Sequence, residues 1–100
     1  MSKPSSLLFL IDDNTKTRFL VDSGAEISLV NDSELMSKPP TIRLACANGS
    51  AIYGHGCKSL ELTFGTGKVY KYDFVVANVT TAILGWDFIT KFGWAVKGAT

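Results

Sequence analysis

The most informative segment of this 100-residue chain is Phe19-Leu20-Val21-Asp22-Ser23-Gly24-Ala25. An apolar run typical of a buried strand ends in an aspartate, and the Ser-Gly that follows favours a tight turn. Burial penalises a charged carboxylate, so an aspartate at this position needs a neighbour that can share its proton. The chain has one Asp-Ser-Gly and is long enough for only one small domain. We therefore expect the neighbour to come from a second copy of the chain.

Two further segments extend this pattern. The first is Ala82-Ile83-Leu84-Gly85-Trp86-Asp87-Phe88-Ile89, an apolar strand closed by glycine and followed by an amphipathic segment. The second is Ala47-Asn48-Gly49-Ser50, which lies between the other two. In this order and spacing the three segments resemble the retropepsin family, the retroviral-type aspartic proteases, and most closely its gypsy-type branch in LTR retrotransposon polyproteins. The resemblance runs from about Leu7 to Lys97.

The resemblance implies an all-β fold, the closed acid-protease barrel with one short C-terminal helix, in an obligate homodimer. Residues 1–100 would form a single protomer. Catalysis would depend on Asp22, Ser23 and Gly24. The two Asp22 carboxylates of a dimer would share one proton, which suits hydrolysis by an activated water at mildly acidic pH. Ser23 would add a hydrogen bond across the two-fold axis, and Gly24 would leave its carbonyl free for the substrate backbone.

The same resemblance implies a groove for an extended peptide. The Asn48-Gly49 hairpin would be the flap, a mobile lid that grips the substrate as an added strand. The expected substrate-binding residues are Ala25, Glu26, Ala47, Asn48, Gly49, Ser50, Thr81 and Ile83. Leu84 is expected to be a structural residue of the core, and His55 is expected to lie on a surface strand without a catalytic role.

Trp86 departs from the family, which commonly has arginine there, paired with the acid that corresponds to Glu26. That ion pair is therefore absent from this chain. Asp87 lies in the first turn of the predicted helix, where a negative charge is favourable.

The amino-acid composition does not support several other classes of function. Hydrophobic residues make up 46% and charged residues 19%, and the formal net charge is +1, which gives no reason to expect a nucleic-acid or anionic-membrane partner. No apolar stretch is long enough for a transmembrane helix, and the N-terminus lacks the pattern of a signal peptide. One histidine and two separated cysteines do not make a zinc site, so we expect no metal and no cofactor.

The cysteines indicate a reducing compartment. A two-residue turn at Asn48-Gly49 would place Cys46 opposite Ala51, with Cys57 far down the other arm. A disulfide between the cysteines would break that register, so free thiols are expected. We expect a cytoplasmic protein, within virus-like particles if the chain comes from a retroelement.

Most of the remaining signals indicate strands and turns. The expected strands are Ser6–Ile11, Lys16–Val21, Glu26–Val30, Thr41–Ala47, Ser50–Gly56, Ser59–Phe64, Val69–Asn78 and Trp94–Val96. A helix start is expected at Asp32, and the clearest helix spans 86–93, with Trp86, Ile89 and Phe92 at helical spacing and Gly93 at its end.

A second hypothesis is a domesticated retropepsin-like domain that dimerises and regulates with little or no proteolysis, as in proteins resembling the DNA-damage-inducible type. The intact Asp22-Ser23-Gly24 favours the enzyme, because a silent domain could relax this motif.

Overall fold

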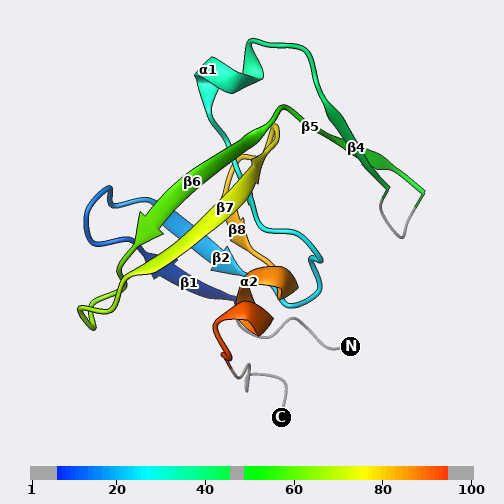
Figure 1. Cartoon of the computed structure of the whole chain (residues 1–100). Helices are drawn as coiled ribbons and strands as arrows, with labels where there is room; N and C mark the ends of the chain where they lie inside the picture. The colour runs from blue at the N-terminus through cyan, green and yellow to red at the C-terminus, as the bar shows by residue number, and fades with distance from the viewer. Residues whose placement is uncertain (1–6, 46–48, 95–100) are drawn as a thin grey trace.

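The computed structural model describes residues 7–45 and 49–94, and its main element is a six-stranded sheet (Figure 1). The strand order across this sheet is β1-β2-β8-β3-β7-β6. The strands are β1 (Leu8–Ile11), β2 (Arg18–Val21), β3 (Leu29–Val30), β6 (Cys57–Leu62), β7 (Tyr70–Val76) and β8 (Ala82–Leu84). These predicted strands are therefore present, although segment 26–30 is a strand only at Leu29–Val30.

The hairpin of β1 and β2 is antiparallel, and it positions Asp22 directly after β2. Asp12, which is fully buried, closes the turn between these strands. Its Oδ2 accepts from the Thr15 amide at 2.9 Å and the Thr15 hydroxyl at 2.8 Å, and its Oδ1 accepts from the Thr63 amide at 2.9 Å. The predicted hairpin is confirmed, and its turn is held to the end of β6.

β8 lies between β2 and β3, and this placement brings two distant segments together. β8 is parallel to β2, with Leu84 beside Val21, and antiparallel to β3, with Ile83 beside Leu29. Because parallel neighbours end at the same edge of a sheet, the residues after Val21 and the residues after Leu84 meet at that edge.

A separate hairpin of β4 (Ile42–Ala45) and β5 (Ala51–Gly54) projects away from the large sheet (Figure 1). Ala45, not Cys46, lies opposite Ala51, so the register predicted from a two-residue turn is wrong by one residue. β4 is described to Ala45 and β5 from Ala51, and Gly49, which precedes β5, has φ +89°. A glycine in the left-handed region is common in hairpin loops longer than two residues.

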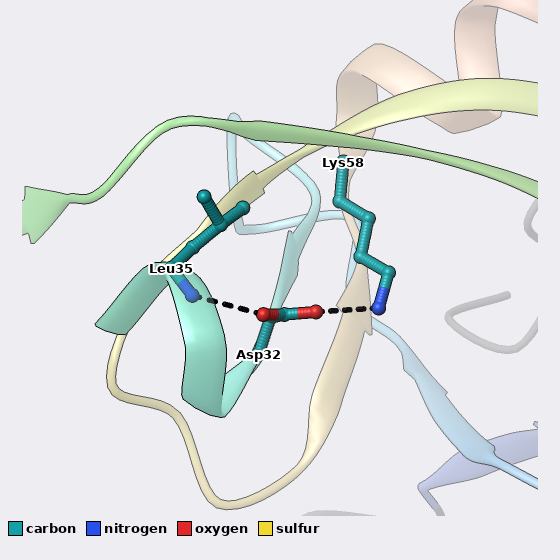
Figure 2. A network of polar contacts seen from close by, with 3 residues as sticks. All are labelled: Asp32, Leu35 and Lys58. Carbon is teal, nitrogen blue, oxygen red and sulfur yellow. Dashed lines mark hydrogen bonds and ion pairs between the residues drawn. The ribbon is translucent and has the colours of Figure 1, made fainter. Parts of the chain in front are cut away.

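The short helix α1 (Ser33–Met36) begins where the sequence predicts, at Asp32. The Asp32 Oδ1 accepts from the Leu35 amide at 3.0 Å, and its Oδ2 lies 2.5 Å from the Lys58 Nζ (Figure 2). These hydrogen bonds, first that from Lys58 and then that from Leu35, lower the pKa of Asp32. One carboxylate thus caps the helix and ties it to β6.

The helix α2 (Trp86–Lys91) confirms the predicted C-terminal helix, and Gly93 at φ +67° follows its end. Its buried residues are Phe88 and Ile89, whereas Trp86 is 51% exposed. Trp86, Ile89 and Phe92 have the predicted helical spacing, but Phe88 rather than Trp86 supplies the large side chain that enters the core.

The core combines buried aliphatic side chains with an aromatic cluster between α2 and the sheet. The Trp94 ring lies 5.2 Å from that of Phe88 and 5.3 Å from that of Tyr70, at steep interplanar angles that favour edge-to-face packing. The other rings in the cluster are Phe19, Phe64, Tyr72, Phe74 and Phe92. Trp94 was predicted to begin a last strand; it packs here outside any strand, and residues 95 and 96 lie outside the described part of the chain.

Cys57 is an exposed free thiol, as predicted, and Cys46 lies outside the described residues. In the ranges that the structure describes, no helix has the length and apolar character needed to cross a bilayer.

Candidate active site

Asp22 lies half-buried on the turn that follows β2. Its amide donates to the Leu84 carbonyl at 3.0 Å, which fixes the residue against β8. Its Oδ1 accepts from the Gly24 amide at 3.0 Å, and its carbonyl accepts from the Ala25 amide at 3.1 Å. Aspartate favours turns of this kind because its side chain can bond the backbone two residues on.

Ser23 and Gly24 are exposed at the tip of this turn. A Cβ on Gly24 would lie 3.3 Å from the Asp22 Oδ1, tighter than ordinary van der Waals contact. The predicted catalytic residues Asp22, Ser23 and Gly24 are thus adjacent in space, and glycine lets the backbone approach the carboxylate closely.

The segment after this turn is attached to the start of α2. The Trp86 amide donates to the Ala25 carbonyl at 2.7 Å, and the Asp87 amide donates to the Glu26 carbonyl at 3.3 Å. The contact is so close that a Cβ on Gly85 would lie 2.7 Å from the Ala25 carbonyl oxygen. Only glycine fits at this junction without displacement of the backbone.

Asp87 is the centre of a hydrogen-bond network beside the candidate site. Its Oδ1 accepts from the Ser28 hydroxyl at 2.7 Å and the Phe88 amide at 2.8 Å. Its Oδ2 accepts from the Tyr72 hydroxyl at 2.9 Å and the Ser28 amide at 3.1 Å. The Ser28 hydroxyl in turn accepts from the Gly85 amide at 2.8 Å.

The network also fixes the proton on Tyr72. Burial, and then the hydrogen bond to the Asp87 carboxylate, raise the pKa of Tyr72 to about 12. The phenol therefore stays protonated across the ordinary pH range and remains a hydrogen-bond donor to Asp87.

The predicted substrate-binding residues fall into three groups. Ala25 and Glu26 lie on the Asp22 loop, and Ile83 lies in β8 beside Leu20 of β2. Gly49 and Ser50 are exposed in the β4–β5 loop, whereas Ala47 and Asn48 lie outside the described residues.

Thr81 takes a different place. It lines a cavity of about 530 Å³ together with Arg18 and Asp12, which lie at the opposite end of β2 from Asp22. This cavity is therefore separate from the candidate catalytic residue. Within the described ranges, no group of three or more His, Cys, Asp or Glu side chains could hold a metal ion.

Glu26 is exposed, and among the described residues it has no cationic partner. The absent ion pair follows from the tryptophan at position 86. Sequence reasoning assigned Asp87 only to the helix N-terminus and missed its bonds to Ser28 and Tyr72. A serine six residues after Asp22, directly before the apolar pair Leu29-Val30, together with an aspartate directly after Gly85-Trp86, was the available signal.

Two solved structures share this fold. EIAV protease complexed with the inhibitor HBY-793 is similar with a TM-score of 0.57 and 19% identity, over 95% of this chain and 94% of that one. The retroviral protease-like domain of Ddi1 from Leishmania major is similar with a TM-score of 0.66 and 15% identity, over 94% of this chain and 83% of that one. No protein-family model and no curated protein matches the sequence. The chain thus has the predicted retropepsin-like fold, mostly β with one short C-terminal helix.

Proposed function

We propose that this chain is one protomer of a homodimeric aspartic endopeptidase, in which Asp22 and the Asp22 of a second copy share one proton. The observation that carries the proposal is the half-buried Asp22 carboxylate, which has one oxygen open to a further partner. Its Oδ1 accepts the Gly24 amide, and its Oδ2 has no protein donor among the described residues. A half-buried carboxylate with one free oxygen is suited to bond a second carboxyl group and a water.

The proposed chemistry follows from the charge of such a pair. Two carboxylates about 3 Å apart cannot both ionise at low cost, so the pair holds one proton. The ionised member removes a proton from a bound water, whose oxygen attacks the carbonyl carbon of the scissile bond. The protonated member donates to the carbonyl oxygen, and the tetrahedral intermediate collapses as a proton passes to the leaving amine. The two apparent pKa values belong to the pair.

The proposed substrate is an extended peptide held between the Asp22 loop and the β4–β5 hairpin. Ala25, Glu26 and Ile83 would contact it from one side, and Gly49 and Ser50 from the other. The sequence resemblance to gypsy-type proteases favours the Gag-Pol polyprotein of a retroelement as the physiological substrate.

A regulatory dimerisation domain is the second candidate. Its support is that the same fold occurs in the retroviral protease-like domain of Ddi1 from Leishmania major. The two candidates differ in one measurable property, cleavage of a peptide bond that depends on Asp22.

The test is incubation of the purified chain with its flanking polyprotein, and with a mixed peptide library, at mildly acidic pH. Asp22→Asn removes the base but nearly preserves the shape of the side chain, so the fold should survive while cleavage falls by at least about a thousandfold. Pepstatin should block the activity of the unmodified chain. Asp73→Asn, on the exposed face of β7, is the matched control and should cleave normally.

Equal cleavage by the Asp22→Asn variant, or cleavage that pepstatin does not block, would refute the aspartic mechanism. No cleavage by a folded, dimeric chain would favour the regulatory candidate. A shared proton further requires that the rate rise and fall with pH, since only the singly charged pair is active.

A further inference from the structure

Five hydrogen bonds join the loop that carries Asp22 to Gly85 and the start of α2, and the Asp87 side chain accepts two of them. The two direct bonds are those from the Trp86 and Asp87 amides to the Ala25 and Glu26 carbonyls. The Asp87 carboxylate adds two bonds to Ser28, which ends the same loop, and Ser28 bonds back to the Gly85 amide. The hydrogen bonds thus form a closed ring that joins the loop to the junction of β8 and α2.

From this ring we infer that Asp87 is a positioning residue, which fixes the Asp22 loop in its catalytic geometry. The inference rests on the proposed function for its kinetic consequences. Asp87 does not touch the reacting atoms; it acts through Ser28 and the backbone of residues 25 and 26.

The chemistry of the ring suits this role. Hydrogen bonds to a carboxylate are roughly twice as strong as those between neutral groups, and Asp87 accepts four of them. Ser28 is 1% exposed, so water cannot readily replace its partners if Asp87 is removed. Tyr72, from β7, holds the outer oxygen of Asp87 and thereby links the ring to the aromatic core.

Two other side chains at this junction, those of Glu26 and Trp86, do little to attach the loop to α2. Glu26 has no cationic partner among the described residues, and Trp86 is directed largely to solvent. The side-chain attachment of the Asp22 loop to α2 therefore depends on Asp87 in this chain.

The experiment compares Asp87→Asn, Asp87→Ala and Tyr72→Phe with the unmodified chain. Asparagine keeps the shape and one acceptor oxygen, whereas phenylalanine removes only the Tyr72 donor. A misplacement of about 1 Å can cost about a hundredfold in rate. We expect kcat per folded dimer to fall about a hundredfold in Asp87→Ala, about tenfold in Asp87→Asn and severalfold in Tyr72→Phe, with a smaller change in KM.

Amide hydrogen exchange supplies a readout that does not need activity. Exchange at Gly24, Ala25 and Trp86 should rise at least about tenfold in Asp87→Asn, while the β6–β7 pair keeps its protection. The matched control is Asp73→Asn, which breaks another serine–aspartate bond, with Ser59, on the exposed face of those strands. It should leave both kcat and the exchange at the Asp22 loop unchanged.

A purely structural role predicts a different pattern. In that case the melting temperature falls, amide exchange rises evenly across the sheet, and kcat per folded dimer is unchanged. This result would overturn the inference. If Asp87→Ala fails to fold, Asp87→Asn and Tyr72→Phe still provide the test. If the unmodified chain cleaves nothing, the proposed function fails, and the local or even pattern of exchange still decides whether Asp87 positions the loop.

Discussion

In four aspartates of this chain, the carboxylate accepts a hydrogen bond from the backbone of a nearby turn or helix start. Asp12, Asp32 and Asp87 use both carboxylate oxygens. Asp22 uses one oxygen on the Gly24 amide, and the other has no donor among the described residues. Asp13 and Asp73 also use one oxygen each, but both are exposed, so among the described residues Asp22 is the half-buried aspartate that keeps an oxygen for a further partner.

Asp12 should make the free energy of unfolding depend on pH. Burial opposes its ionisation, but the hydrogen bonds from the Thr63 amide and from Thr15 outweigh burial and lower its pKa below the ordinary 3.8. A lowered folded-state pKa means that the stabilisation is present above about pH 4 and is lost as the pH falls through the folded-state value. Asp12→Asn should cost about 2 kcal/mol of unfolding free energy at pH 7 and less at pH 3.

Denaturant unfolding at fixed protein concentration, from pH 3 to pH 7, measures this difference. Asp13→Asn, next to Asp12 but exposed, is the control. A difference between Asp12→Asn and the unmodified chain that stays constant with pH would show that the ionised form of Asp12 is not the stabilising one.

At the residue scale, sequence reasoning succeeded where the signal is local. The turn position of Asp22 after β2 and the cap of Asp32 on α1 are confirmed, whereas the catalytic role of Asp22 stays a prediction. The role of Asp87 could not be found in this way, because its partner Ser28 lies 59 residues away in the sequence. Only the strand order, which places β8 between β2 and β3, brings the two together.

At the element scale, the site depends on how closely α2 approaches the Asp22 loop. The parallel pair of β2 and β8 could not be read from the sequence, since neither strand carries a pattern that selects its neighbour. The hairpin of β4 and β5 was predicted correctly, but its register was not. A two-residue turn at Asn48-Gly49 would pair Cys46 with Ala51, whereas Ala45 is the residue that pairs with Ala51.

Gly85→Ala tests the approach of α2 to the loop. The added methyl would meet backbone atoms of Ala25 and Ile27 at 2.7 to 2.9 Å, and backbone cannot move aside as a side chain can. We expect a loss of about 1–3 kcal/mol in unfolding free energy, together with reduced cleavage by the molecules that remain folded. The measurements are denaturant unfolding and kcat per folded dimer.

Gly54→Ala is the matched control for this substitution. Its methyl would meet a side-chain atom, the Val75 Cγ1, at 2.9 Å rather than backbone, so we expect a smaller loss of unfolding free energy than in Gly85→Ala and no loss of activity per folded dimer. A Gly85→Ala chain as stable and active as the unmodified one would show that the junction tolerates a wider spacing than the structure indicates.

At the scale of the whole molecule, exposed apolar side chains occur at the end of the sheet that carries Asp22. The start of β1, the end of β2 and α2 meet there (Figure 1). Leu7 is 65% exposed and Leu8 55%, and Trp86 is half-exposed at the start of α2. A surface of this kind is costly in a monomer and suits a second copy, which would also bring the second Asp22.

The dimer should therefore weaken when this end of the sheet becomes polar. Leu8→Lys would remove a large apolar side chain from the proposed interface. Burial of such a side chain is worth about 1.5–3 kcal/mol, so the dimer dissociation constant should rise about ten- to a hundredfold. Ile11→Lys is the matched control, since Ile11 is equally exposed at the other end of β1, beside Arg18. Specific activity is measured on serial dilution, and sedimentation gives the mass of the species present. The activity of Leu8→Lys should begin to fall at a higher protein concentration than that of the unmodified chain or of Ile11→Lys. Equal effects of the two lysines would place the second copy elsewhere.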